Sequence, residues 1–222
     1  KKFYEDLGKV TIQNFKMIGG SGVDEKEFPF TKPLKKGKIE IVYTGRILKD
    51  KGVIDLIKAM KLLDDESKKD IVLKLYGTID IKNPAHIKEE ELKSQLIRGF
   101  IKWEGFTSEV KRILESADIY CLPSYREGLP KSSIEAMAIG RPIITTNVPG
   151  CEDTVQDGYN GYKIEAGDVE ALSKKLNELI KNKQLRIQMG ENSRKLFLRN
   201  FTLEKVISQI VESYNSVLSI TC

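Results

Sequence analysis

The chain has 222 residues, of which 40% are hydrophobic and 31% are charged. This is an ordinary globular composition, sufficient to bury one sizeable core. No apolar run approaches the ~20 residues that a helix needs to cross a bilayer, and no apolar signal segment stands near the first residue. Because that residue is Lys1 rather than methionine, we expect a fragment of a longer gene product.

The net charge of +5 comes in part from one basic segment, which holds Lys32, Lys35, Lys36 and Lys38. Such a segment could attract phosphates or lipid headgroups, but charge runs are weak evidence and we favour a solvated surface. No aromatic residues interleave with the basic ones in the pattern that base stacking requires. We therefore expect no nucleic acid partner.

The three cysteines, Cys121, Cys151 and Cys222, are widely spaced and form no CxxC pair. An odd, scattered set argues against a disulfide framework or a zinc site and favours a reducing, cytoplasmic compartment. Cys121 lies in an apolar run and is expected to be buried. The single histidine, His86, cannot hold a metal without other ligands and is expected at the surface, so we predict neither metal nor cofactor.

From residue 39 onward, short apolar runs alternate with segments of helical apolar spacing. Strands are predicted over residues 39–44, 71–76, 101–104, 118–122, 143–146 and 161–164. Helices are predicted over residues 52–63, 87–98, 110–117 and 130–139, and from residue 168 to the end. The last of these helical segments, 201–218, carries one apolar face formed by Leu203, Val206, Ile210, Tyr214 and Val217.

The alternation predicts an α/β fold, a Rossmann-like parallel sheet with helices on both faces, followed by C-terminal helices. Residues 19–22, Gly-Gly-Ser-Gly, indicate a hinge or linker ahead of it. In such sheets the ligand binds outside the carboxyl ends of the strands. The polar and glycine residues that follow the strands are therefore the candidates for a site: Gly45-Arg46, Gly105-Phe106 and the segment 124–128.

The segment 127–135 is the richest of these. A helix predicted to start near Pro130 presents unpaired N–H groups and the positive end of its dipole, which suits a diphosphate. Gly128 lets the backbone approach a ligand, and Pro130 provides no donor of its own. The useful amides are then expected to be those of Gly128, Leu129, Lys131 and Ser132.

Two acids flank this helix start. Glu135 stands about five residues into the helix, ~7 Å along its axis, with its side chain leaning back toward the start. A nucleoside diphosphate across the helix start would place its ribose near Glu135 and its sugar near Glu127. A carboxylate can accept two hydrogen bonds from a diol, which suits hydroxyl recognition. Acids are also common near helix starts without any ligand, and spacing alone leaves both interpretations open.

A second constellation follows the first strand. Beyond Gly45, Arg46 and Lys51 could converge on a diphosphate, and they would stabilise the leaving nucleotide as its bond to the sugar breaks. A basic loop without a ligand is the alternative. Because no Asp-x-Asp pair occurs in the chain, these two cations and the helix dipole would take the place of a metal ion.

Beyond these patterns, residues 18–218 resemble the family 4 glycosyltransferases of the two-domain GT-B fold. The stretch from Glu127 to Gly150 matches the family's central signature, in which two glutamates stand eight positions apart. The stretch from Gly45 to Gly52 matches its phosphate-contacting loop. Residues 155–161 match the segment that follows the signature, and residues 20–28 resemble the entry into the C-terminal domain.

The resemblance implies retaining, metal-independent transfer of a hexose or N-acetylhexosamine from a nucleotide sugar, with UDP as the expected nucleotide. It assigns the ribose to Glu135, the donor sugar to Glu127 and the diphosphate to Arg46 and Lys51. It places two further residues near the base, Phe106 and Thr107. The sequence is similar to bacterial capsule and lipid-linked oligosaccharide members, which implies a saccharide or polyprenyl-diphosphate-linked acceptor and peripheral contact with the inner face of the plasma membrane.

The resemblance also implies a division of the chain. Residues 1–38 would be the remnant of an N-terminal domain and a linker, 39–200 the nucleotide-sugar-binding domain, and 201–222 a helix that crosses to the N-terminal domain. In the family that domain supplies acceptor contacts and a histidine near the donor sugar, which His86 cannot replace. We therefore expect this chain alone to bind donor but to transfer sugar poorly.

Four other functions were weighed. A nucleotide-sugar epimerase or a sugar phosphorylase would share the GT-B architecture, but no residue here favours either. A regulatory domain that only binds nucleotide would have no need of both glutamates together with Arg46 and Lys51. A dinucleotide-dependent dehydrogenase is disfavoured, because no GxGxxG follows the first strand.

Overall fold

The computed structural model describes residue 20, residues 22–33 and residues 37–218. Within them, six parallel strands form one sheet in the order β3-β2-β1-β4-β5-β6. The strands are β1 (Ile39–Thr44), β2 (Ile71–Tyr76), β3 (Ile101–Gly105), β4 (Ile119–Leu122), β5 (Ile143–Thr146) and β6 (Gly161–Ile164). The predicted Rossmann-like parallel sheet is confirmed, and β1, β2, β5 and β6 have the predicted bounds.

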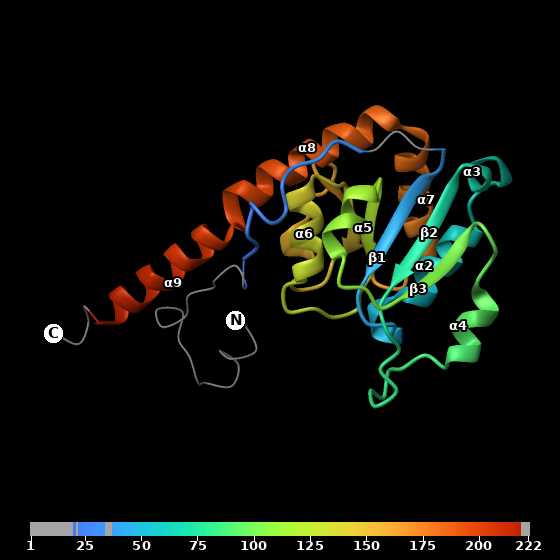
Figure 1. The fold of residues 1–222 in the computed structure, drawn as a ribbon, viewed down its shortest axis with the longest axis horizontal. Helices are drawn as coiled ribbons and strands as arrows, with labels where there is room; N and C mark the ends of the chain where they lie inside the picture. Colours follow the sequence, from blue (N-terminus) through green and yellow to red (C-terminus); the bar gives the residue numbers. More distant parts are fainter. Residues whose placement is uncertain (1–19, 21, 34–36, 219–222) are drawn as a thin grey trace.

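Helices cover both faces of the sheet (Figure 1). Helices α5 (Val110–Ser116) and α6 (Lys131–Ile139) pack together against β1, β4 and β5. Helices α2 (Val53–Lys61), α3 (Asp65–Lys69) and α7 (Val169–Lys181) pack together against β2, β5 and β6. The remaining helical elements are η2 (Lys49–Lys51), α4 (Glu89–Gln95), η3 (Glu152–Thr154), α8 (Lys183–Asn200) and α9 (Leu203–Leu218). Of these, α8 packs on α6.

Several helix bounds differ from the prediction. The helix predicted over 87–98 is reduced to α4, because the backbone of Ile97 bonds to that of Ile101 in a turn that leads into β3. Pro130 stands just before α6 as its N-cap rather than inside it. The helical region predicted from residue 168 onward consists of α7, α8 and α9, of which only the last was predicted as a separate segment. The side chain of Asn182 caps the start of α8 by accepting from the amide of Leu185 at 2.9 Å. Helix α3 was not predicted.

Residues 22–33 are attached to the C-terminal half of the domain. Val23 exchanges backbone hydrogen bonds with Phe201 and Leu203, at 3.0 and 2.9 Å. The fully buried Arg141 donates to the carbonyl of Thr31 at 2.9 Å and to that of Leu114 at 2.8 Å. A buried guanidinium is tolerated when its donors are met by carbonyls in this way. These bonds fix the segment against α5, α6 and the junction of α8 with α9.

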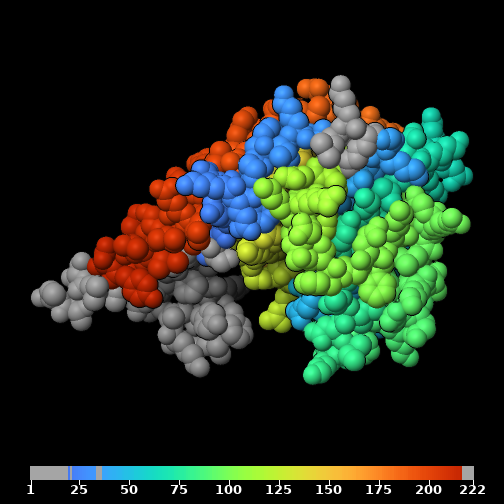
Figure 2. Space-filling view, in the orientation of Figure 1, coloured from blue at the N-terminus to red at the C-terminus, as the bar shows by residue number. Residues whose placement is uncertain are grey.

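Helix α9 extends away from the sheet domain (Figures 1 and 2). Val206 is buried, but the side chains of Leu203, Ile207, Val211 and Tyr214 are 39%, 49%, 50% and 68% exposed. Their spacing places them along one side of the helix. Of the residues predicted to form its apolar face, Val206 packs on the domain, Leu203 and Tyr214 face outward, and the side chain of Val217 lies outside the described residues.

The cysteines and the histidine can also be compared with the prediction. Cys121 is fully buried, as predicted, and burial raises the pKa of its thiol. Cys151 is likewise buried, and burial raises its pKa too. His86 is half-buried rather than fully at the surface, because its Nδ1 lies 2.9 Å from the carbonyl oxygen of Asn83. No helix in the described ranges is long and apolar enough to cross a membrane.

Candidate functional site

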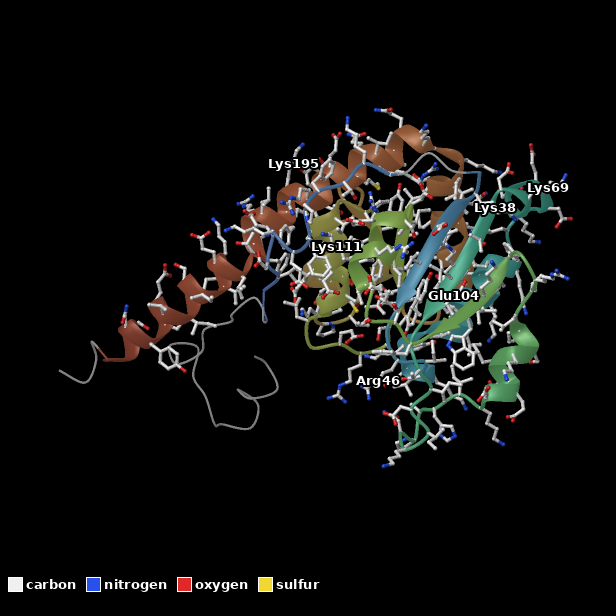
Figure 3. All side chains as sticks on the ribbon, in the orientation of Figure 1. Lys38, Arg46, Lys69, Glu104, Lys111 and Lys195 are labelled. Atoms are coloured by element: carbon white, nitrogen blue, oxygen red, sulfur yellow. The ribbon has the colours of Figure 1, made fainter. Side chains whose placement is uncertain are left out.

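The candidate site lies at the reversal of strand order in the sheet. From β1 the chain continues to β2 and β3 on one side, and then to β4, β5 and β6 on the other. The helices that follow β1 and β4 lie on opposite faces of the sheet, and α/β sheets bind ligands in the crevice at the carboxyl ends of such strands. Arg46 follows β1 at this end, whereas Lys38 of the basic segment lies at the opposite end of the same strand (Figure 3). Lys38 is thus remote from the crevice, whereas Lys35 and Lys36 lie outside the described residues.

Lys51 and Glu127 meet across this crevice, although 76 positions separate them. Lys51 Nζ lies 2.7 Å from Glu127 Oε1, and their side chains are only 14% and 17% exposed. The same Nζ donates to the carbonyl of Arg126 at 3.3 Å. Since an ammonium group has three donors, one remains for a ligand. The sequence predicted both residues at the site, and the structure brings them together as an ion pair.

The two loops that carry this pair are tightly packed against each other. The amide of Tyr125 donates to the carbonyl of Asp50 at 2.8 Å, and Ser124 Oγ donates to the same carbonyl at 3.1 Å. Gly52 has a φ of 68°, and a Cβ on it would lie 2.0 Å from the carbonyl oxygen of Pro123. Only glycine combines this left-handed backbone with so close an approach. The contact fixes Lys51 relative to the loop that carries Glu127.

We expect Gly52→Ala to lower the free energy of unfolding by about 2 kcal/mol, since it adds a backbone clash to left-handed strain. Gly99→Ala is the matched control, because Gly99 also has a positive φ, of 78°, but a Cβ added to it would meet no atom within 4 Å. Urea unfolding of both variants measures the difference. Equal losses of stability would show that the packing of Gly52 on Pro123 contributes nothing.

The start of α6 stands beside this pair without a side-chain cap. Pro130 is the N-cap and forms no side-chain hydrogen bond with the helix. Lys131 and Ser132 open the helix, Gly128 is exposed and Leu129 is half-buried. A side chain at Gly150 would place its Cβ 2.1 Å from the carbonyl oxygen of Gly128. The loop before α6 therefore packs directly on Gly150. The helix start therefore keeps the anion-binding character that the sequence predicts.

Glu135 is the second acid of the predicted site and lies in the next turn of α6. It is 9% exposed, and its Oε1 lies 3.6 Å from Lys131 Nζ. Burial raises the pKa of this carboxyl, Lys131 lowers it, and the charge of Glu27 raises it further. A carboxylate that is buried at a net cost, close to an anion-binding helix start, is typical of a functional site.

A cavity of about 230 Å³ adjoins the loop that follows β1. Arg46 lines it together with two residues predicted near the base, Phe106 and Thr107, and Phe106 is 76% exposed. Its remaining lining residues are Thr44, Gly45, Tyr76, Gly77, Thr78 and Val110. The guanidinium of Arg46 lies 3.3 Å from Asp80 Oδ2. The expected convergence of Arg46 and Lys51 is thus not seen as a shared contact, since each pairs with a different carboxylate.

The sequence reasoning missed Gly77, Thr78 and Asp80. They directly follow β2, so the same rule that selected the ends of β1, β3 and β4 would have found them. A Cβ at Gly77 would lie 1.8 Å from the carbonyl oxygen of Gly45, which shows how closely the loops after β1 and β2 are packed. The indole of Trp103 donates to the carbonyl of Gly77 at 2.8 Å and fixes the second loop.

A larger cavity, of about 460 Å³, lies beside the same two loops. It is lined by Lys49, Asp50, Ile54, Asp55, Glu91 and Tyr125. Three carboxylates against one ammonium make it unsuitable for a diphosphate, which the start of α6 and Lys51 would attract instead. The smaller cavity, which Arg46 lines, has no carboxylate among its lining residues. Among the described residues, no cluster of three or more His, Cys, Asp or Glu side chains could hold a metal ion.

The chain is similar to proteins that transfer sugars. Residues 24–196 match the family of glycosyl transferases group 1. The capsular polysaccharide biosynthesis glycosyltransferase CapM of Staphylococcus aureus is 32% identical over 178 residues, which are 80% of this chain and 46% of CapM. The N,N'-diacetylbacillosaminyl-diphospho-undecaprenol alpha-1,3-N-acetylgalactosaminyltransferase of Campylobacter jejuni is 31% identical over 170 residues, 76% of this chain and 43% of the relative.

Solved structures are similar in fold. HepE of Anabaena, crystallised with UDP and glucose, matches with a TM-score of 0.76 and 20% identity, over 88% of this chain and 55% of HepE. This chain spans about half the length of the curated relatives it matches. Its six-stranded sheet with flanking helices corresponds to one Rossmann-like half of the GT-B fold. On the family match and these two relatives, the chain belongs to the glycosyl transferases group 1 family.

Proposed function

We propose that this chain is the donor-binding half of a retaining, metal-independent glycosyltransferase that takes a hexose or N-acetylhexosamine from a UDP-linked donor. The observation that carries the proposal is the half-buried Lys51–Glu127 pair beside the uncapped start of α6. It unites a cation, a carboxylate and a helix dipole at the reversal of strand order, where α/β sheets bind nucleotides. HepE supports UDP as the nucleotide, since it was crystallised with UDP and glucose.

The charges at this position suit departure of the nucleotide. When the bond between the sugar and the diphosphate breaks, its electron pair goes to the phosphate oxygen and negative charge develops there. The remaining donor of Lys51, the amides at the start of α6 and the guanidinium of Arg46 would meet this charge. No metal ion is required for that stabilisation. The acceptor oxygen forms the new bond to the sugar carbon, and its proton passes to the departing phosphate oxygen, so that atoms and charge balance.

Glu127 would bind the sugar of the donor. Its Oε1 is engaged by Lys51, but a carboxylate accepts several hydrogen bonds, so its second oxygen can receive sugar hydroxyls. Glu135 would hold the ribose hydroxyls one turn further along α6. Phe106 and Thr107 would lie beside the base at the cavity of about 230 Å³, and Gly128, Leu129, Lys131 and Ser132 would surround the diphosphate.

We expect Glu127→Gln to weaken the binding of UDP-sugars by about 10-fold, because a charge-assisted hydrogen bond to a sugar hydroxyl is lost. Bare UDP should bind almost as in the wild type, since Lys51 is then released from its ion pair and stays available to the diphosphate. Isothermal calorimetry with UDP, UDP-glucose and UDP-N-acetylglucosamine measures the difference. Equal losses for UDP and its sugars would contradict the role of Glu127.

The proposed function itself is tested by a thermal-shift panel of UDP, GDP, ADP and their sugars with the unmodified chain. A ligand at hundredfold excess over its dissociation constant adds about 2.7 kcal/mol to the free energy of unfolding. We expect the uridine compounds to raise the melting temperature and the adenine compounds to leave it unchanged. A panel in which no nucleotide shifts the melting temperature would overturn the proposal.

We further propose that the acceptor is a saccharide or a polyprenyl-diphosphate-linked saccharide and is bound largely by residues outside this chain. The relative of Campylobacter jejuni has an undecaprenol-linked acceptor in its name, and capsule synthesis is named for CapM. The exposed apolar side of α9 would then pack on a domain that precedes this one, in the cytoplasm and in peripheral contact with the membrane. The isolated chain should accordingly bind donor but transfer little sugar.

A further inference from the structure

Two tyrosines lie buried directly beneath the candidate diphosphate site, and the function proposed above gives neither of them a role. Tyr43 is on β1 and Tyr120 is on the adjacent strand β4, and both side chains are fully buried. Each ends in a hydroxyl group that forms a hydrogen bond to one of the two elements expected to bind the diphosphate. A buried hydroxyl carries a desolvation cost, which these bonds offset.

Tyr43 supports the loop that follows β1. Its hydroxyl donates to the backbone carbonyl of Arg46 at 2.6 Å. A Cβ at Gly45 would lie 3.0 Å from the same hydroxyl oxygen, so the loop rests closely on the phenol. Burial raises the pKa of Tyr43 far above its usual range, and the charges of Tyr120 and Glu127 raise it further. This shift favours the protonated hydroxyl, which is the form that donates to the Arg46 carbonyl.

Tyr120 supports the first turn of α6. Its hydroxyl donates to Ser132 Oγ at 2.7 Å, and it lies 3.3 Å from both the carbonyl oxygen and Oγ1 of Thr44. A serine hydroxyl that accepts a hydrogen bond still has its own proton to donate. The structure records no acceptor for that proton among the described residues. Ser132 stands at the start of α6, where the helix dipole favours an anion.

We propose that Tyr43 and Tyr120 are positioning residues for the diphosphate, the first by fixing the Arg46 loop and the second by orienting the Ser132 hydroxyl toward a phosphate oxygen. The inference rests on the proposed function, because it assumes that a nucleoside diphosphate binds here. It assigns to the two buried hydroxyls the role of holding the expected phosphate-binding elements in place. Pre-organised donors bind an anion more tightly than donors that must be ordered on binding.

The first test compares Tyr43→Phe and Tyr120→Phe with the wild type by calorimetry, using UDP and uridine as ligands. Each variant should bind UDP about 5-fold more weakly, since one supporting hydrogen bond of ordinary strength is lost. Uridine lacks the diphosphate and should bind as in the wild type. Tyr162→Phe is the matched control, because the hydroxyl of Tyr162, on the far strand β6, donates to Glu178 on α7. Loss of this hydrogen bond should leave the affinities for UDP and uridine unchanged.

The second test asks whether Tyr120 acts through Ser132. We expect Ser132→Ala to weaken UDP binding in the wild type and to have a smaller effect in the Tyr120→Phe variant, which a double-mutant cycle measures. The inference would be overturned if the losses from Ser132→Ala and Tyr120→Phe were additive. It would also be overturned if either tyrosine variant lost equal affinity for UDP and uridine, or bound UDP within twofold of the wild type. If the wild type binds no nucleotide, the proposed function fails and the inference falls with it. Failure of the variants alone refutes only the tyrosine roles.

Discussion

Replacing Lys51 with methionine is expected to weaken the binding of UDP by about 10- to 100-fold. A hydrogen bond to a charged group contributes about 1.5–3 kcal/mol, and 1.4 kcal/mol corresponds to a factor of ten. The variant also leaves Glu127 without its cation, 17% exposed and close to the expected phosphates, where its charge would repel them. Calorimetry with UDP measures the loss, and uridine, which carries no phosphate, should be affected far less.

Loss of stability must be separated from loss of binding in this experiment. Removal of one partner of a half-buried ion pair destabilises a protein, whereas replacement of both partners by neutral groups of similar shape is often close to neutral. Lys51→Met combined with Glu127→Gln should therefore recover the melting temperature of the wild type but not its affinity for UDP. Lys69→Met is the matched control, because Lys69 is exposed and lies at the opposite end of the domain from Arg46 (Figure 3). Recovery of UDP affinity in the double variant would contradict a direct role for Lys51.

The sheet could be predicted closely because its strands are unambiguous in the sequence. The segments Ile39–Thr44 and Ile71–Tyr76 are nearly continuous apolar runs ended by glycine, as expected for strands buried on both faces. Helix α6 was predicted to within one residue, since Pro130 and Gly140 stand at its two ends and Gly140 adopts the left-handed conformation. The candidate site was then chosen from the direction of the strands.

The side-chain pairing could not be predicted, because it depends on the paths of loops that the sequence pattern does not determine. Both cations were expected to converge on a phosphate, yet Lys51 contacts Glu127 and Arg46 contacts Asp80. The supporting bond from Tyr43 to Arg46 was invisible for another reason. In the sequence pattern, a tyrosine in a buried strand looks like any other core residue. Only the structure shows that the hydroxyl of Tyr43 contacts the loop that carries Arg46.

The ends of the C-terminal helices illustrate the same limit. Residues 168–222 have helical apolar spacing almost throughout, so no periodicity marked the first break, at Asn182, whereas the second, at residues 201–202, agrees with the separate helix predicted over 201–218. The second break arises from a contact distant in sequence, the backbone pairing of Val23 with Phe201 and Leu203. Because α9 leaves the domain after this break, the side chains of Leu203, Ile207, Val211 and Tyr214 stay exposed.

Glu135 is the residue at which binding and stability should oppose each other. Burial raises the pKa of its carboxyl, so the folded chain holds the proton more firmly than the unfolded chain does. The free energy of unfolding contributed by this group should then fall as the pH rises from the ordinary glutamate pKa through the raised one. Glu135→Gln removes the titrating group. We expect it to raise the melting temperature at neutral pH by about 1–3 °C, and to abolish this part of the pH dependence.

The same substitution should weaken the binding of every ribose-bearing ligand by about 10- to 100-fold, because an amide cannot accept hydrogen bonds from both ribose hydroxyls as a carboxylate does. UDP-glucose is the suitable ligand, since its diphosphate is esterified at both ends and does not titrate near neutral pH. Its affinity for the wild type should decline as the pH falls through the raised pKa of Glu135, whereas its affinity for the variant should be low and almost independent of pH. A more stable protein that binds less tightly would mean that the buried charge is retained for the nucleotide. A variant that loses stability and keeps its affinity would make Glu135 a structural partner of Lys131 and nothing more.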